Sequence, residues 1–248
     1  MLYCAFGGKE KGFYVDVGAS DPNLISITKR FYEMGWRGIN IEPLPEKFAK
    51  LKAIRTKDVN LNVGCADQNG ELDFVGTFVS EDIDRFKANK GESTIKKVPV
   101  MRLSDILEQY LSSPDHPIDF CTIDTDGFER NVLLGLDFSR FRPKVFCIES
   151  TTVAVERTHN NFQDILVDNG YEIAYIYGIN RYYVDTKYLY CERIFENFLK
   201  ISEQEIRTRV VQINNSIEHI IQHPREFYKR AIEKLSARRK LKRQLSNT

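Results

Sequence analysis

The residues best able to do chemistry are acidic side chains placed where short apolar runs stop. Asp16 lies in the run FYVDV just before a Gly18-Ala19-Ser20 turn, and Glu42 ends the run RGINIE. Strands of a parallel sheet end along one edge, so these groups are expected to face a common crevice. A carboxylate has two acceptor oxygens and can accept both hydroxyls of a ribose. The spacing therefore predicts a nucleoside-binding crevice, with Glu42 as its ribose ligand.

Two later apolar runs also end in carboxylates. Asp124 ends IDFCTID, Asp126 follows in the turn, and Glu149 ends PKVFCIE. A positioned carboxylate or histidine can act as a general base, so the candidates are Asp124, then Glu149, then His159. The simpler interpretation of His159 is a surface residue at the start of a helix. Asp124, Asp126 and Glu149 can instead form a site for a hard cation such as Mg²⁺.

The elements that must position these groups alternate between strands and helices. Continuous apolar strands predict a mostly parallel sheet buried on both faces. We expect a helix over 22–34 that begins at Pro22, a single strand over 59–65, and a helix capped by Ser104. The aromatic, alternating segment 171–190 predicts a closing antiparallel hairpin.

Composition restricts the class of protein. The net charge is +1 over 248 residues, but residues 224–248 hold nine Lys or Arg and two Glu, so the rest is acidic. Nucleic acid is therefore not an expected partner. Five scattered cysteines without a C-x-x-C pair indicate free thiols in a reducing compartment. With no signal peptide and no long apolar run, we expect a cytoplasmic protein without a membrane span.

The chain divides by pattern into a catalytic-type domain over 1–192 and a helical extension over 193–248 with a basic tail. Apolar residues near the start of the extension recur at spacings of four and three residues. This spacing predicts a helix that packs on the domain, forms a homodimer, or joins a larger polypeptide.

The glycine turn lacks the second and third glycines that suit a pyrophosphate. It is better suited to a nucleoside with an amino-acid tail. Together with Glu42 one strand later and the antiparallel hairpin, it favours S-adenosylmethionine over a nicotinamide dinucleotide.

Several blocks together resemble the FkbM-type S-adenosylmethionine-dependent methyltransferases. The blocks are GFYVDVGASDP (12–22), GWRGINIEP (35–43), VNLNVGCAD with GELDF (59–74), VMRLSDIL (100–107), IDFCTIDTDGFERNVLLGLDF (118–138) and PKVFCIES (143–150). The resemblance runs from about residue 12 to about residue 190. Asp126 departs from the Glu that the family usually has in its D-x-E-G turn.

The resemblance implies an α/β, Rossmann-like class I methyltransferase: a mostly parallel seven-stranded sheet ordered 3-2-1-4-5-7-6, with the C-terminal extension outside it. It implies transfer of a methyl group to a hydroxyl, most often of a sugar in a glycan or nucleotide sugar. The cofactor-binding residues that it implies are Asp16, Gly18, Ala19, Ser20, Ser26, Glu42, Pro43, Asn62 and Val63. Simpler interpretations stay open for several of them. Asp16 can only cap the following helix, Glu42 can be a surface strand end, and Ser26 can be an ordinary polar helix residue. Asn62 and Val63 can be plain strand residues.

Three rival functions stay open at this stage. The acceptor can be a small-molecule or lipid hydroxyl instead of a sugar. The domain can be a non-catalytic methyltransferase-like module that binds a partner. An RNA methyltransferase would use the basic tail, but the acidic remainder of the chain disfavours this.

Overall fold

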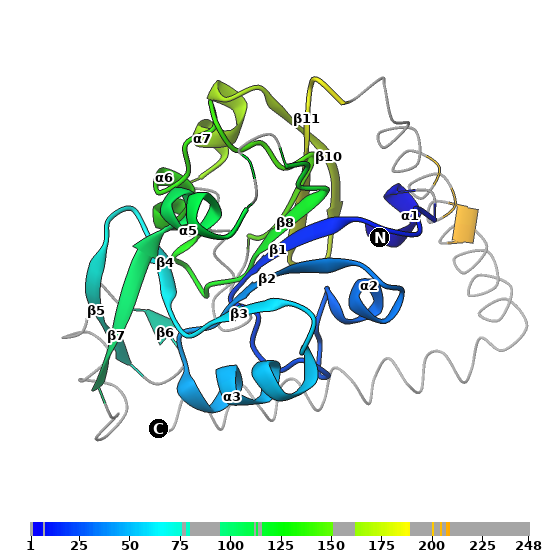
Figure 1. Ribbon diagram of the computed structural model, residues 1–248. Helices are drawn as coiled ribbons and strands as arrows, with labels where there is room; N and C mark the ends of the chain where they lie inside the picture. Colours follow the sequence, from blue (N-terminus) through cyan, green and yellow to red (C-terminus); the bar gives the residue numbers. More distant parts are fainter. Residues whose placement is uncertain are drawn as a thin grey trace, which may run out of the picture. The chain divides into compact units, whose positions relative to one another are not determined.

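The computed structural model describes residues 2–6, 8–75, 78–79, 95–111, 113, 116–150 and 162–188, with residues 200, 204, 207 and 208 (Figure 1). The chain divides into two compact units, Met1–Leu199 and Lys200–Thr248. In the second unit, the four described residues are helical. The expected boundary after residue 192 and the candidate base His159 lie outside the described residues, and both stay predictions.

The main sheet has the predicted strand order. Within the described residues it contains seven strands, ordered β10-β11-β9-β8-β1-β2-β3. Numbered along the chain, this is 3-2-1-4-5-7-6. Their bounds are β1 Phe13–Val17, β2 Arg37–Ile41, β3 Val59–Leu61, β8 Phe120–Ile123, β9 Val145–Glu149, β10 Tyr171–Tyr177 and β11 Asn180–Asp185. β11 runs antiparallel to both of its neighbours, β9 and β10, and forms the closing hairpin with β10.

A second sheet lies beside the first and was not predicted. Its described strands are ordered β4-β7-β5-β6. Their bounds are β4 Gly64–Ala66, β5 Gly70–Val75, β6 Phe78–Val79 and β7 Ile95–Arg102. The single strand expected over 59–65 is wrong, because the chain leaves the main sheet after Leu61 and enters the second sheet at Gly64.

Short helices connect the strands. The described helices are α1 Leu2–Ala5, α2 Lys29–Glu33, α3 Pro45–Ile54, α5 Leu103–Tyr110, α6 Glu129–Leu134 and α7 Gln163–Asp168. The cap expected at Ser104 is wrong: α5 begins at Leu103, and Ser104 Oγ instead accepts a hydrogen bond from the Asp137 N–H at 2.6 Å. In the part of the chain that the structure describes, no helix has the length and apolar character to span a membrane.

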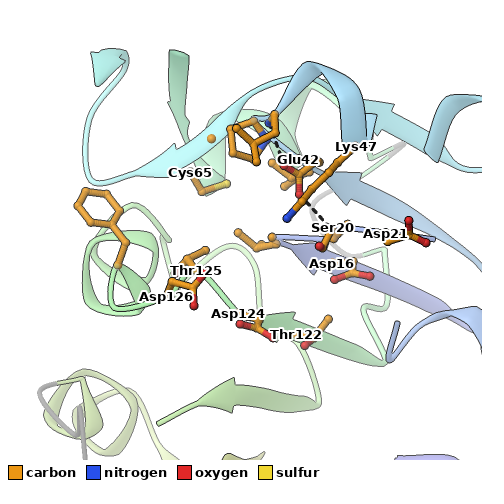
Figure 2. Close-up of a pocket in the computed structure, with 18 of the residues that line it drawn as sticks. Asp16, Ser20, Asp21, Glu42, Lys47, Cys65, Thr122, Asp124, Thr125 and Asp126 are labelled. Atoms are coloured by element: carbon orange, nitrogen blue, oxygen red, sulfur yellow. Dashed lines mark hydrogen bonds between the residues drawn. The ribbon is translucent and has the colours of Figure 1, made fainter. Parts of the chain in front are cut away.

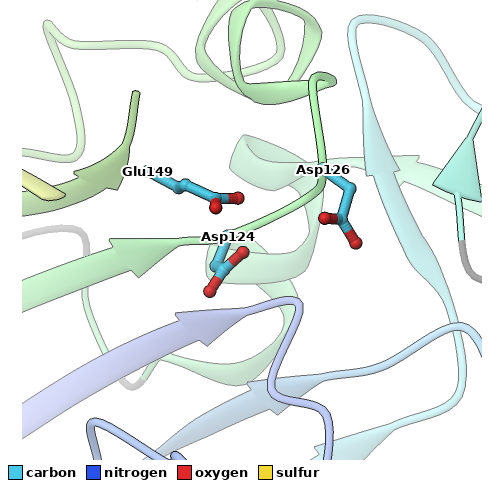
Figure 3. Close-up of side chains that lie close together, drawn as sticks. All are labelled: Asp124, Asp126 and Glu149. Atoms are coloured by element: carbon cyan, nitrogen blue, oxygen red, sulfur yellow. The ribbon is translucent and has the colours of Figure 1, made fainter. Parts of the chain in front are cut away.

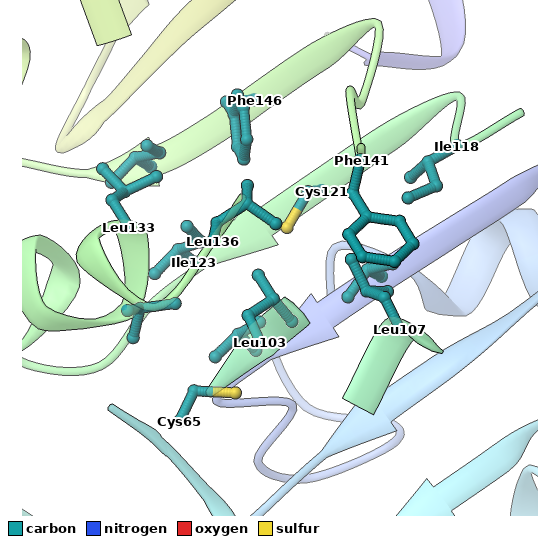
Figure 4. Close-up of a cluster of buried hydrophobic side chains, with 14 of the residues drawn as sticks. Cys65, Leu103, Leu107, Ile118, Cys121, Ile123, Leu133, Leu136, Phe141 and Phe146 are labelled. Atoms are coloured by element: carbon teal, nitrogen blue, oxygen red, sulfur yellow. The ribbon is translucent and has the colours of Figure 1, made fainter. Parts of the chain in front are cut away.

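The main sheet is buried on both faces, as a parallel sheet requires. One face packs against α5, α6 and α7 through aliphatic residues such as Leu103, Leu133 and Ile123 (Figure 4). The opposite face carries an aromatic cluster in which Phe31 of α2 lies 4.7 Å from Phe120 of β8, ring centre to ring centre. Cys65, Cys121 and Cys147 are buried and free, as expected. Packing on both faces of the sheet holds in place the edge at which the strands end.

The helix expected over 22–34 is wrong in its first half. Asp21 accepts hydrogen bonds from the N–H groups of Asn23 and Leu24, which forms a turn instead of a helix start. Ile25 then has a φ of 59°, a left-handed conformation that interrupts any helix. The helix therefore forms only as α2, and residues 21–28 are a loop. This loop lies at the carboxyl end of β1, where it borders the site.

Candidate functional site

A cavity of about 380 Å³ opens where β1, β2 and β8 end (Figure 2). Its size lies within the usual range for small-molecule sites. The sequence-predicted residues that line it are Asp16, Gly18, Ala19, Ser20, Ser26, Glu42, Pro43, Asp124 and Asp126. Most of the predicted set therefore meets at one place, although the residues come from segments more than 100 positions apart.

Glu42 links the ends of the first two strands. Its Oε2 accepts a hydrogen bond from the Ser20 N–H and its Oε1 one from the Leu44 N–H, both at 2.8 Å. The side chain is buried, and burial raises its pKa. Since a carboxylate offers about four acceptor positions, each oxygen can still accept one more hydrogen bond. Glu42 is thus held rigidly while retaining acceptors for two neighbouring hydroxyls.

The turn after β1 requires glycine. Gly18 has a φ of +81°, and a Cβ at this position would lie 1.9 Å from the Asp124 carbonyl oxygen. The Gly18 and Ala19 N–H groups both donate to the Ile41 carbonyl oxygen, at 3.0 and 3.1 Å. The turn is therefore pressed between β8 and β2, and the backbone at residues 18–20 borders the cavity directly.

Asp16 projects from β1 on the aromatic face of the sheet. Its Oδ2 accepts a hydrogen bond from Thr28 Oγ1 at 2.6 Å. Burial raises the pKa of Asp16 to about 7, with Asp124 and Glu42 adding to the rise and Arg55 opposing it. A cationic ligand group beside Asp16 would favour its charged form. The position suits a ligand that carries an amino group.

Arg55 holds the 21–28 loop in place, a role that was not predicted from the sequence. The side chain is 1% exposed, and its guanidinium donates to the Thr28 and Pro22 carbonyl oxygens and to Ser26 Oγ. It also lies over the Tyr32 ring at 4.9 Å. Ser26 therefore lines the cavity as part of a loop that one buried cation holds together, and not as part of a helix.

Three carboxylates gather at the ends of β8 and β9 and in the turn after β8 (Figure 3). Ligand-type oxygens of Asp124, Asp126 and Glu149 all lie within 4.8 Å of one another. Burial and the neighbouring Asp124 raise the pKa of Glu149 well above its usual range. The turn is held by Glu129, whose Oε1 accepts from the Thr125 N–H, the Thr125 hydroxyl and the Gly127 N–H. The two base candidates that the structure describes, Asp124 and Glu149, therefore lie together at the ends of β8 and β9, beside a braced turn.

The apolar side of the cavity comes mainly from the second sheet. Its lining residues are Leu72 and Phe74 of β5, Val100 of β7, and Phe128 directly before α6. Asn62 and Val63, expected at the adenine, do not line the cavity: Asn62 Nδ2 donates to the Glu42 and Pro43 carbonyl oxygens, and Val63 packs in the main core. The alternation of Leu72 and Phe74 along β5 was the available signal for this wall.

A family model describes most of this region. The Methyltransferase FkbM domain matches residues 16–173, which is more than half of the chain. The chain belongs to the FkbM methyltransferase family. The match includes the β1 turn, Glu42 and the three-carboxylate cluster, so the whole candidate site lies inside it.

Among solved structures, the FkbM domain is similar to an FkbM methyltransferase from Methylobacillus flagellatus KT, with 15% identity and a TM-score of 0.46 over 71% of this chain and 44% of that one. The chain thus spans less than half the length of that structure. A fibrillarin pre-rRNA processing protein from Methanococcus jannaschii shows 12% identity and a TM-score of 0.41, over 71% and 67%. A precorrin-6y C5,15-methyltransferase from Geobacter metallireducens GS-15 shows 14% and 0.38, over 74% and 83%. No curated protein sequence matches the chain significantly.

The FkbM family implies S-adenosylmethionine as the methyl donor, and the residues present fit it. Glu42 retains acceptors for a ribose diol, and Asp16 with the backbone of residues 18–20 suits the amino-acid end. The apolar wall of Leu72, Phe74 and Phe128 offers a surface for a base. The cavity thus has polar groups suited to the ribose and the amino-acid end of the cofactor, and an apolar wall suited to its adenine.

Replacing Arg55 with Met should weaken S-adenosylmethionine binding about tenfold. The change leaves three buried oxygen acceptors without their donor, and each such loss costs about 1–3 kcal/mol. The loop that carries Ser26 should then lose its fixed conformation. Calorimetry on Arg55→Met and on Arg140→Met, an exposed arginine of the same length, measures the effect. Equal affinities in both variants would show that the loop is held by other contacts.

Proposed function

We propose that this methyltransferase transfers the methyl group of S-adenosylmethionine to a hydroxyl, of a sugar in a glycan or nucleotide sugar. The observation that carries this proposal is the position of Asp124 and Glu149. Both carboxylates lie at the strand ends next to the expected cofactor cavity, where an acceptor would meet the methyl group. A hydroxyl is a weak nucleophile, and a positioned base is what it needs.

S-adenosylmethionine, when bound, supplies a methyl group on a sulfonium: the acceptor oxygen forms the new C–O bond as the S–C bond breaks, and its electron pair stays on sulfur. The protein aligns the acceptor oxygen and receives its proton. Asp124 is exposed toward the cavity and is the first candidate to accept that proton. Alignment can supply about 7–11 kcal/mol and a positioned base about 10²–10⁴-fold in rate.

The acidic lining of the cavity supports a neutral sugar ring as the group that meets the methyl donor, and not a nucleic acid. Its charged lining residues in the described chain are Asp16, Asp21, Glu42, Asp124 and Asp126, with Lys47 as the single cation. Such a lining repels a phosphate backbone. Carboxylates also accept hydrogen bonds from neighbouring sugar hydroxyls. A divalent cation held by the same carboxylates would also activate the acceptor, because a hydroxyl bound to the cation is more acidic.

The proposal includes a cytoplasmic location. Buried thiols such as those of Cys121 and Cys147 stay reduced in that compartment.

One observation favours a second acceptor class. Leu24 and Ile25 line the cavity and are 71% and 102% exposed. Large apolar side chains facing solvent at a cavity rim suit an acceptor with apolar surface of its own. The alternative acceptor is therefore the hydroxyl of an apolar small molecule or lipid.

A methyl-transfer assay with S-adenosylmethionine and a panel of acceptors tests the proposal. The panel contains monosaccharides, nucleotide sugars, apolar alcohols and a short RNA, and the readout is the mass increase of one methyl group. We expect methylation of a sugar hydroxyl, with apolar alcohols as the second outcome. Methylation only of RNA, or cofactor binding without transfer to any acceptor, would contradict the proposal, and the second result would indicate a non-catalytic module.

A further inference from the structure

We propose that Asp124, Asp126 and Glu149 bind one divalent cation on the acceptor side of the cavity. The three side chains come from the end of β8, the turn after it and the end of β9, and their carboxylates converge (Figure 3). Three carboxylates grouped at one place repel one another, so a bound cation or a held proton stabilises the group.

Glu149 provides independent evidence that a ligand binds at this cluster. The residue is 6% exposed, and its Oε2 is buried without a hydrogen-bond partner among the described residues. Buried carboxylate oxygens without a partner are costly and therefore rare. Figure 3 shows the Glu149 carboxylate directed toward Asp124 and Asp126. The unpartnered oxygen thus belongs to the group that faces the other two acids.

The described part of the chain forms no ion pair with this cluster. No lysine, arginine or histidine in the described ranges forms an ion pair with any of the three acids, although eight other acidic residues there do form such pairs. Lys47 lines the same cavity and attracts Asp126 electrostatically without forming an ion pair with it. A bound cation would supply the direct charge contact that the ion pairs of the described chain do not give.

The dimensions and chemistry fit a hard cation. Oxygens on opposite sides of Mg²⁺ lie about 4.2 Å apart, and on opposite sides of Ca²⁺ about 4.8 Å. The separations within 4.8 Å therefore fit one coordination sphere, with a small contraction for Mg²⁺. Carboxylate oxygens are the ligands these ions prefer, and softer metals would need nitrogen or sulfur. Mg²⁺, Mn²⁺ and Ca²⁺ are the matching class.

The role of this cation in catalysis rests on the proposed function. Three carboxylates leave coordination positions open, and two neighbouring hydroxyls of an acceptor can fill them. A cation bound there would lower the pKa of the attacking hydroxyl and fix its direction toward the cofactor. The site would therefore select acceptors with a vicinal diol, a pattern that sugars carry and simple alcohols lack.

Titration with Mn²⁺ tests the site without cofactor or acceptor. Electron paramagnetic resonance of the full chain measures free Mn²⁺, and we expect one bound ion per chain. Glu149→Gln should weaken binding about tenfold or more, because affinity follows the number of charged ligands. Glu172→Gln, at an exposed glutamate of β10, is the matched control and should bind as the wild type does. If Glu149→Gln does not fold, Asp126→Asn replaces it, since Asn tolerates the φ of 55° at that position.

The outcomes separate the cation site from the proposed function. No Mn²⁺ binding up to about 1 mM, the weak end of carboxylate sites, would overturn the site, as would equal binding by wild type and Glu149→Gln. If Mn²⁺ binds as expected and no acceptor is methylated, the site stands and the function fails. If methylation proceeds unchanged in the presence of a chelator and Mn²⁺ does not bind, the function stands and the site fails.

Discussion

Replacing Asp124 with Asn should lower kcat by about 10²–10⁴-fold and leave the affinity for S-adenosylmethionine nearly unchanged. Asn cannot accept the acceptor's proton and is a poorer ligand for a cation, so both proposed roles of Asp124 predict the loss. Losing an interaction that is made only in the transition state lowers kcat without changing ground-state binding. Steady-state rates with the acceptor found in the panel, together with calorimetry, measure both quantities.

Asp168→Asn is the control for this variant. Asp168 is an exposed aspartate at the end of α7 and does not line the cavity. Its replacement should leave both quantities unchanged. A loss of cofactor affinity in Asp124→Asn that equals its loss of rate would place Asp124 among the cofactor ligands instead.

Replacing Asp16 with Asn should weaken S-adenosylmethionine binding about tenfold to a hundredfold while making the protein more stable. Hydrogen bonds to charged groups contribute about 1.5–3 kcal/mol, which sets the loss of affinity. The Thr28 hydroxyl can still donate to the Asn oxygen, so the local packing is kept. The negative charge of Asp16 that we expect to bind the cofactor is unfavourable in the protein without cofactor, because the side chain is buried.

The stability gain has a defined pH dependence. Burial raises the pKa of Asp16 from 3.8 to about 7, so between these values the folded chain holds a proton that the unfolded chain has released. The free energy of unfolding of the wild type therefore falls as pH rises from about 4 to about 7, by about 2–4 kcal/mol from this group. Asp16→Asn should match the wild type near pH 4 and exceed it by that amount at pH 8. Asp124, Glu42 and Arg55 are the charged groups that face this carboxylate.

Urea unfolding at pH 4, 6 and 8 measures this difference, with Asp67→Asn as the control at an exposed turn aspartate. A parallel titration with S-adenosylmethionine at pH 8 gives the affinity. If Asp16→Asn binds the cofactor as tightly as the wild type, Asp16 only supports the loop through Thr28 and is not a cofactor ligand.

The sheet and the polar half of the site were predictable because they depend on local patterns. Continuous apolar strands determine a buried parallel sheet, and strand ends such as Asp16, Glu42 and Asp124 must then share one edge. The glycine at residue 18 marked a turn that no side chain could occupy. These features need only the order of elements along the chain, which the sequence states directly.

The remaining parts depend on contacts between distant segments. Arg55 ends a helix and would usually point into solvent, yet it is buried under a loop some 30 residues earlier. The apolar wall exists because β4 and β5 pair with β7, and nothing local in 64–75 specifies that partner. The loop at 21–28 had apolar residues at helical spacing, but the Asp21 turn and the positive φ at Ile25 overrode that spacing.

Calorimetric titration of S-adenosylmethionine into the wild type and Glu42→Gln tests the central claim most directly. The claim is that the cavity at the ends of β1 and β2 binds this cofactor through Glu42. The prediction is one molecule bound per wild-type chain with a micromolar Kd, and binding at least about tenfold weaker in Glu42→Gln because one acceptor of the ribose diol is lost. No binding to the wild type, or equal binding by the two proteins, would contradict it.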